Sequence, residues 1–307
     1  MSPYFTYLLG FLLAFAFSAA LVPAVRAGAI RRGHVTQPRE DRWHSSPTPA
    51  LGGIAIFIAF LLAFAIAAVY VPPSGGVMQY LPLVLCAFLV FTVGLVDDLC
   101  QLSPQNKLVG QFIAAAILVF FGFKVEWFVS KTLNSFVSIF WIVAVTNAFN
   151  LLDNMDGLAA GIATISAFFL GAIILVGNGI HGGNGQLLIL ATFMGSLLGF
   201  LLYNFYPASI FMGDSGSQFL GFLLAGTTVH QQLYYSGQLI PIILVPLLIV
   251  FIPIWDTGFV SIMRTLFGRS IAKGGKDHTS HRLVAIGMSE GKAVVMLYIF
   301  SVFGGSV

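Results

Sequence analysis

Apolar residues fill most of the chain in long blocks that short polar segments separate. Each block approaches the length of about 20 apolar residues that a helix needs to cross a bilayer. The pattern predicts ten membrane-spanning helices, at residues 3–25, 50–71, 80–96, 106–123, 135–150, 158–177, 186–203, 216–233, 239–263 and 291–307. No convincing internal repeat emerges, so we expect an all-α polytopic membrane protein with a single domain over residues 1–307.

The same pattern covers both ends of the chain. No basic segment precedes the first block and no small-residue cleavage site follows it, so we expect a retained helix and not a cleaved signal peptide. The tenth block runs into the last residue, Val307, which allows for a further segment beyond it.

Composition supports the membrane interpretation. Of the 307 residues, 58% are hydrophobic and 8% are charged, with a mean hydropathy of +0.95, whereas soluble domains have roughly 25% charged residues. The formal charge of +3 does not indicate nucleic-acid binding. Cys86 and Cys100 form neither a disulfide framework nor a zinc-site spacing, which argues against redox chemistry.

The charged residues predict the orientation. When the helices alternate, twelve of the fourteen Lys and Arg residues fall on one face, and Lys124 and Lys131 fall on the other. The positive-inside rule makes the basic face cytoplasmic and places the N-terminus outside. Every acidic residue except Glu126 shares that face. Because charges are costly in hydrocarbon, we expect an active site there that handles cations.

Asp97 and Asp98 are adjacent carboxylates at the end of a predicted helix, and Lys107 follows in the same loop. Two neighbouring carboxylates require a metal, another cation or a shared proton to relieve their repulsion. Mg²⁺ takes one or two carboxylates together with phosphate oxygens of a substrate. The alternative is a helix end in water, which the helix dipole disfavours.

Polar side chains recur every third residue in the next loop. Asn147, Asn150 and Asp153 would share one helix face, and Asp156 is next along the same stripe. We expect these oxygen-bearing groups to face one cavity. An EF-hand is excluded because the terminal Glu of its twelve-residue loop is absent, and an amphipathic surface strip is the alternative.

Glycines flank two other predicted helix starts. Asp214 lies between glycines before a helix, where backbone N–H groups favour phosphate oxygens and the acid can hold their metal. A simple N-cap by Asp214 or Ser215 is the alternative. Gly52 and Gly53 permit a close approach to a bound group, or form the start of a helix after a basic loop.

The last predicted loop carries Asp277, His278, His281 and Arg282 after a Lys-Gly-Gly-Lys segment. The His and Arg donors of this loop suit a diphosphate or a nucleotide. Zinc binding by the two histidines and Asp277 is the alternative, but a fourth ligand is missing.

Asp256 lies inside the ninth predicted helix, where we expect it to be buried and paired with Arg264. His230 and Trp255 are interpreted as core or interfacial groups, because lone amphipathic side chains near helix ends are common membrane anchors.

Together these segments resemble the polyprenyl-phosphate N-acetylhexosamine-1-phosphate transferase family, which includes phospho-N-acetylmuramoyl-pentapeptide transferase. The resemblance covers nearly the whole chain, and its carriers are Asp97-Asp98 with Lys107 and the segments 147–159, 211–217 and 277–283. It implies transfer of a sugar 1-phosphate from a UDP-sugar to a membrane polyprenyl phosphate. It also implies release of UMP and a requirement for Mg²⁺, for which Mn²⁺ can substitute.

The resemblance also implies residue roles. Asp214 would be the chief metal ligand, with Asn150 beside it. Asp97 or Asp98 would accept the lipid phosphate's proton or position that phosphate, and Asp153 and Asp156 would orient the nucleotide or the metal. The residues expected to bind the substrates are Lys107, Asn147, Asn150, His278, His281 and Arg282.

Ser280 stands where many relatives carry another His, which favours the branch that starts O-antigen, teichoic acid or capsule polymers over the muramoyl-pentapeptide branch. UDP-N-acetylglucosamine is the expected donor. The implied location is the bacterial cytoplasmic membrane, with the bilayer, a polyprenyl phosphate and a second copy of the chain as partners.

Two other classes remain as alternatives. An ion-coupled transporter also uses carboxylates, but usually near the middle of the membrane and with inverted repeats. A structural membrane subunit would explain the apolar helices but not the acids.

Overall fold

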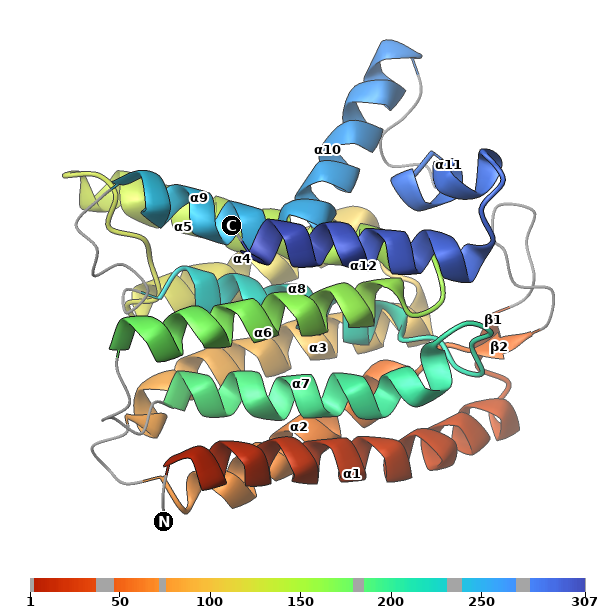
Figure 1. Cartoon of the computed structure of the whole chain (residues 1–307), viewed down its shortest axis with the longest axis horizontal. Helices are drawn as coiled ribbons and strands as arrows, with labels where there is room; N and C mark the ends of the chain where they lie inside the picture. The colour runs from red at the N-terminus through yellow and green to blue at the C-terminus, as the bar shows by residue number, and fades with distance from the viewer. Residues whose placement is uncertain are drawn as a thin grey trace.

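A computed structural model of the chain describes residues 3–36, 47–71, 76–178, 185–230, 239–268 and 277–306. The helices are α1 Pro3–Arg31, α2 Gly52–Ala68, α3 Leu81–Cys100, α4 Pro104–Phe120, α5 Lys131–Leu152, α6 Leu158–Asn178, α7 Gly185–Asn204, α8 Gly213–Thr228, α9 Leu239–Ile249, α10 Phe251–Leu266, α11 Thr279–Ala285 and α12 Glu290–Ser306. A 3₁₀ turn, η2 Val77–Tyr80, precedes α3, and β1 Val35–Thr36 pairs antiparallel with β2 Thr48–Pro49. Most of the helices lie side by side in one bundle (Figure 1), which confirms the all-α prediction.

Five described stretches are long and apolar enough to cross a membrane: Tyr4–Arg31, Val77–Cys100, Lys131–Leu152, Leu158–Val176 and Gly185–Asn204. Helix α2 is apolar but shorter. The other predicted spans also form helices, each of fewer than 18 residues as described. The chain is therefore a membrane protein, and the total of ten spans stays a prediction.

Local capping decides where α4 and α5 begin. The Ser103 hydroxyl accepts the Asn106 N–H, and Pro104 occupies the first helical position, where its missing N–H costs nothing. The Ser130 hydroxyl accepts the Leu133 N–H in the same way at the start of α5. The cap at Ser103 places Lys107 in the first turn of α4.

Helix α8 lies at the centre of the bundle. All its residues from Ser215 to Thr228 are buried, and it packs against α2, α3 and α5. The Phe219 ring contacts the rings of Phe57 and Phe193 edge-on, at centroid distances of 5.2 and 5.8 Å. This helix therefore carries its polar first turn, with Asp214, into the middle of one end of the bundle.

The paired glycines of α2 are explained by α8. Gly52 N–H donates to the Phe211 carbonyl and Gly53 N–H to the Met212 carbonyl, at 2.9 and 2.8 Å. A Cβ on Gly53 would collide with the backbone of Gly216. The close approach thus admits the start of α8 and not a bound group.

The prediction of one helix over 239–263 was wrong. Helix α9 ends at Ile249 and α10 begins at Phe251, because Pro253 supplies no N–H and its ring excludes the carbonyl four residues earlier. That Ile249 carbonyl accepts the Ser166 hydroxyl instead, at 2.9 Å. Helix α10 consequently leaves the direction of α9 and rises from the bundle (Figure 1).

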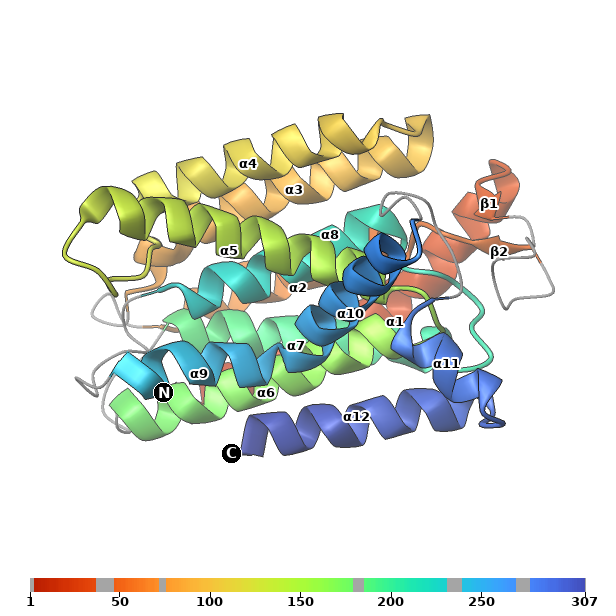
Figure 2. The same ribbon diagram turned by 90° about the horizontal axis from the view of Figure 1, so that it is seen from above.

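The connections that carry the predicted site lie together. The α3–α4, α5–α6 and α7–α8 connections and the start of α12 are all at the same end of the bundle, opposite both marked chain ends (Figure 2). The α4–α5 connection, which holds Lys124 and Glu126, is at the other end. The predicted segregation of charge is confirmed for these described segments, while the side of the membrane that they face stays a prediction.

Candidate active site

The Lys107 ammonium connects two of the predicted site carboxylates. Its Nζ lies 3.0 Å from Asp97 Oδ2 and 2.8 Å from Asp214 Oδ2. The other oxygen of Asp97 accepts the Leu102 N–H at 2.7 Å. Helices α3, α4 and α8 thus bring two carboxylate oxygens to one cation position, and all three side chains keep partial access to solvent.

Asp214 is held in its ionised form. Burial alone would raise its pKa, but the attraction of the Lys107 ammonium and hydrogen bonds from Lys107 and Asn150 outweigh burial. The pKa of Asp214 therefore lies below its ordinary value. An anionic oxygen is what a metal ion or a cationic side chain requires at this position.

Asp98 caps the start of α8. Its Oδ1 accepts the Asp214 N–H at 2.7 Å and its Oδ2 accepts the Ser215 N–H at 3.0 Å. Gly213 makes the turn before them with a φ of 77°. We predicted that these N–H groups would receive phosphate oxygens, and this was wrong because a resident carboxylate already occupies the positive helix end.

The repulsion within the Asp97-Asp98 pair is therefore offset in part within the protein. Lys107 compensates one carboxylate and the first turn of α8 compensates the other. Because backbone donors engage both oxygens of Asp98, this residue positions α8, and Asp97 is the better candidate for contact with a substrate.

A chain of amides leads to Asp214, and its two middle members were not predicted from the sequence. Asn147 Nδ2 donates to Gln111 Oε1 at 2.6 Å, Gln111 Nε2 donates to Gln218 Oε1 at 3.1 Å, and Gln218 Nε2 donates to Asp214 Oδ2 at 3.3 Å. A carboxylate only accepts, so it fixes the orientation of each amide in turn. A signal was available, because Gln111 follows Lys107 and Gln218 follows Asp214 by four residues, one helical turn.

Only the first half of the polar stripe predicted from Asn147 to Asp156 lies on one helix. Asn147 and Asn150 lie on α5, and Asn150 Nδ2 donates to Ser217 Oγ of α8 at 2.9 Å. Helix α5 then ends at Leu152, within a run of Asp, Asn and Gly that favours turns.

Asp153 and Asp156 lie beyond this helix end, so placing all four residues on one helix face was wrong. Asp153 is half-buried directly after Leu152. Asp156 Oδ2 accepts the Ala208 N–H at 2.8 Å and so ties the α5–α6 connection to the α7–α8 connection.

A second cluster forms around Asp256 of α10. Asp256 is 2% exposed, with Oδ2 2.7 Å from His278 Nδ1, and its Oδ1 accepts the Thr279 N–H at 2.6 Å. The predicted pair of Asp256 with Arg264 was wrong, because Asp256 binds the first turn of α11. Arg264 Nε instead donates to Asp277 Oδ2 at 3.1 Å.

The other residues predicted for the last loop join the same cluster. The rings of His278 and His281 lie 5.7 Å apart, and the Arg282 guanidinium lies 4.7 Å above the Phe259 ring. The Ser280 hydroxyl donates to Asn154 Oδ1 at 2.7 Å, which links α11 to the α5–α6 connection. The structure thus places His278, His281 and Arg282 close to one another.

The remaining cationic loop residues, Arg269, Lys273 and Lys276, lie outside the described residues, as does the first predicted inner loop at 37–46. In the part of the chain that the structure describes, no three His, Cys, Asp or Glu side chains are grouped to hold a metal ion. The zinc alternative therefore receives no support from those residues.

The carboxylate cluster suits a metal that shares its coordination with a substrate. Asp97 and Asp214 direct two oxygens to one point, and Mg²⁺ characteristically binds one or two carboxylates plus phosphate oxygens instead of a complete protein cage. The histidine and arginine cluster offers donors to a polyanion. The two clusters together can bind both phosphate-bearing partners of a phosphoryl transfer.

Comparison with known proteins identifies the family of the chain. The sequence profile of glycosyl transferase family 4 matches residues 80–232. "Probable undecaprenyl-phosphate N-acetylglucosaminyl 1-phosphate transferase" of Bacillus subtilis is 34% identical over 288 residues, which cover 91% of this chain and 77% of the relative. "Decaprenyl-phosphate N-acetylglucosaminephosphotransferase" of Mycolicibacterium smegmatis is 36% identical over 308 residues, which cover 90% of this chain and 75% of the relative. "Phospho-N-acetylmuramoyl-pentapeptide-transferase" of Campylobacter lari is 32% identical over 298 residues, covering 85% and 80%.

Proposed function

Because the chain belongs to glycosyl transferase family 4, we propose that it transfers N-acetylhexosamine 1-phosphate from a UDP-sugar to a membrane polyprenyl phosphate and releases UMP. The observation that carries the proposal is the convergence of Asp97 and Asp214 on one cation position at the end of a membrane bundle. At that position the polyprenyl tail can remain in lipid while the nucleotide arrives from water.

Mg²⁺ is the proposed cofactor, and Mn²⁺ is expected to substitute for it. Asp214 and Asp97 would hold the ion, with Asn150 beside Asp214. When bound, the metal would neutralise charge on the donor diphosphate. This fits the donor set because both ligands are oxygens and the remaining positions are left to phosphate and water.

The reaction joins an oxygen of the lipid phosphate to the β-phosphorus of the donor and breaks the bond to the α-phosphate, which leaves as UMP. Such transfers depend on positioning and on compensation of phosphate charge. Lys107 can contribute by moving from the two carboxylates to a substrate phosphate, since its flexible stem already reaches both acids. Asp97 would position the acceptor phosphate, and Asp98 would hold the first turn of α8 in place.

His278, His281 and Arg282 are proposed to bind the donor. Asp256 engages His278 at Nδ1, so Nε2 is the ring nitrogen left for a phosphate oxygen or the uridine. Asp153, near the link between α11 and the α5–α6 connection, would help to orient the nucleotide. Asp156 would act by holding two connections together at the site.

UDP-N-acetylglucosamine is the proposed donor, because relatives with N-acetylglucosamine in their names match 90% or more of the chain at 34% and 36% identity. The product would then start a cell-envelope polysaccharide. The muramoyl-pentapeptide transfer is the second candidate, supported by the relative from Campylobacter lari. The excess of Lys and Arg at the site end supports a cytoplasmic face of the bacterial inner membrane.

The ion-coupled transporter is disfavoured by the family assignment and by the position of the acids. Asp97, Asp98 and Asp214 lie at helix ends and not in the middle of spans, where transporters place their coupling residues.

The decisive experiment measures UMP release by the purified protein with polyprenyl phosphate and a panel of UDP-sugars. The panel includes UDP-N-acetylglucosamine and UDP-N-acetylmuramoyl-pentapeptide, each with and without Mg²⁺. We expect UMP only when lipid, metal and UDP-N-acetylglucosamine are all present. Release from every donor without the lipid, or from none in folded protein, would reject the proposal.

A further inference from the structure

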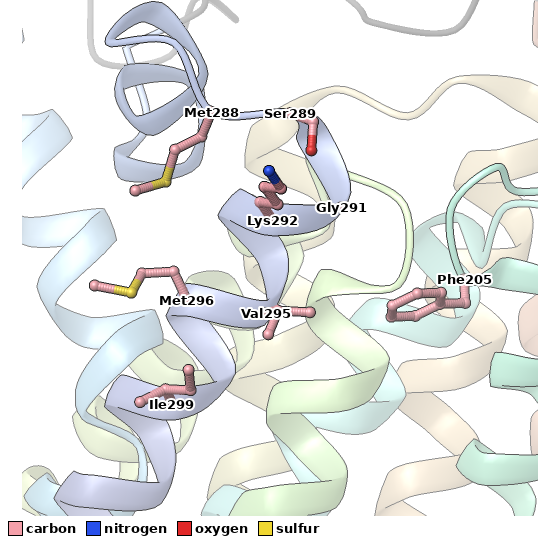
Figure 3. A pocket seen from close by; sticks show the side chains of 8 residues that line it. All are labelled: Phe205, Met288, Ser289, Gly291, Lys292, Val295, Met296 and Ile299. Atoms are coloured by element: carbon pink, nitrogen blue, oxygen red, sulfur yellow. The ribbon is translucent and has the colours of Figure 1, made fainter.

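A shallow pocket of about 530 Å³ lies on the outer face of α12, and none of the residues of the two site clusters lines it. Figure 3 shows its lining, which includes Phe205 at the end of α7 and Val295, Met296 and Ile299 along α12. The Lys292 ammonium and the Ser289 hydroxyl lie at one end of the pocket and Ile299 at the other (Figure 3). We refer to these residues as the α12 groove.

The groove has a single cation at its polar end. Lys292 is exposed, and within the described ranges no ion pair is found for it. Glu290 does not line the pocket, and burial together with the neighbouring Asp156 carboxylate raises the pKa of Glu290. The nearest acid in sequence is therefore directed to the site side of α12, which leaves the Lys292 charge to a ligand.

The apolar part of the groove continues as a stripe along the helix. Lys292, Val295, Ile299 and Phe303 are spaced by three and four residues, so they share one face. Val295, Ile299 and Phe303 are 44%, 46% and 65% exposed. From Lys292 to Phe303 the helix rises by about 16 Å, which is half of the ~30 Å hydrocarbon core of a bilayer.

We propose that the α12 groove binds an anionic phospholipid, with its phosphate on Lys292 and Ser289 and one acyl chain along Val295, Met296 and Ile299. A lysine for the headgroup, and an apolar stripe that ends about 16 Å from it, at the depth of one leaflet, match such a lipid in both charge and length. The flexible Met side chains of the pocket can adapt to a lipid acyl chain, which has no fixed shape. The site does not depend on the proposed transfer reaction, because it uses none of its residues.

The test is native mass spectrometry of the full chain in detergent, with equimolar phosphatidylglycerol and phosphatidylcholine of matched acyl chains. We expect preferential retention of one phosphatidylglycerol. A lysine near a lipid phosphate contributes about 1 kcal/mol, so Lys292→Gln should reduce that retention about fivefold, and Lys292→Arg should preserve it. The matched control is Lys131→Gln, which removes an exposed lysine from the first turn of α5 at the other end of the bundle and should change nothing.

Three results would overturn the proposal. The first is equal retention of the two lipids by the unchanged protein, and the second is an equal loss in Lys131→Gln. The third is displacement of the phosphatidylglycerol by one equivalent of polyprenyl phosphate, which would assign the groove to the reaction's acceptor. Lys292 is exposed, so its substitution should leave the fold intact, and an unchanged melting temperature would verify this.

Discussion

The two polar clusters at the end of the bundle are built in different ways. The carboxylate cluster combines side chains from α3, α4, α5 and α8, and its members bond directly between helices. The histidine cluster depends on α10, which departs from the bundle after the break at Pro253, and on the short helix α11. In the first cluster one lysine lies between carboxylates, so its net charge is negative. In the second cluster each acid has its own partner, Arg264 for Asp277 and His278 for Asp256.

This difference indicates a division of work. The carboxylate cluster, which is bonded directly between helices, suits the proposed metal and the lipid phosphate, where small displacements cost most. The histidine cluster lies where α10 leaves the bundle, and it is tied to the bundle by the packing of α10 on α5, by the packing of α11 on α12 and by the hydrogen bond from Ser280 to Asn154. It is suited to receiving a soluble donor. If this is correct, variants in the two clusters should affect different kinetic constants.

The largest effect is expected from Asp214→Asn. The variant removes the negative charge that pairs with Lys107 and that is proposed to bind the metal, so we expect kcat to fall about 10³-fold. Binding of Mn²⁺, followed by electron paramagnetic resonance in the presence of UDP-N-acetylglucosamine, should weaken in parallel. Glu126→Gln, which alters an exposed acid at the other end of the bundle, is the control and should turn over normally. Full Mn²⁺ binding by Asp214→Asn would contradict the assignment.

Removal of the metal should come next. Chelation is expected to lower turnover at least 100-fold, because a metal supplies several kcal/mol of charge stabilisation in the transition state, and added Mg²⁺ or Mn²⁺ should restore it. Without substrates the melting temperature should change by less than about 2 °C, since Lys107 already bridges the two carboxylates. A large loss of stability on chelation would instead indicate a structural metal.

Asp256→Asn tests the histidine cluster. Asn can still accept the Thr279 N–H, but it loses the charge that orients His278. We expect kcat/KM for the UDP-sugar to fall about 10–100-fold, as for other groups that orient a functional histidine, while KM for the polyprenyl phosphate stays unchanged. A change in KM for the polyprenyl phosphate alone would contradict the proposed division of roles between the clusters.

The smallest effect on activity is expected from Gln218→Met, which tests the amide chain behind Asp214. The variant leaves Gln111 Nε2 buried without its acceptor, which should cost about 1–3 kcal/mol of stability and raise the Mg²⁺ concentration needed for half-maximal activity a few fold. The double variant Gln111→Met/Gln218→Met should recover most of the stability, because it leaves no buried amide without a partner. Asn147 Nδ2 still donates to the Val143 carbonyl at 2.8 Å. Thermal melts of the three proteins measure this. If the loss of stability in the double variant equals the sum of the losses in the two single variants, the amides act independently.

Part of the site was predictable because its residues stand out locally. Asp97, Lys107 and Asp214 are rare charges at the ends of apolar blocks, and the cost of burying charge in lipid predicts that they lie together. Gln111 and Gln218 are uncharged residues within apolar helices. Their spacing from Lys107 and Asp214 was visible in the sequence, but the hydrogen bond between the two amides was not predictable from it.

Other details depended on where helices end. A period of three residues predicted one stripe from Asn147 to Asp156, but α5 stops at Leu152 and Asp156 binds Ala208 of another connection. The partner of Asp256 could not be derived, because the choice between Arg264 and His278 depends on how α11 returns to α10.

The sequence by itself determined that the chain forms apolar helices, that its charges gather at one end, and that it resembles a family of sugar-phosphate transferases. These properties follow from hydrophobicity, helix length and residue type, which are local. Only the tertiary structure decided which donor meets which acceptor, as when Asp98 takes the first N–H groups of α8 and Lys107 joins Asp97 to Asp214. Hydrogen bonds and ion pairs act over about 3 Å, so their partners depend on how helices distant in sequence pack, and no local pattern specifies that packing.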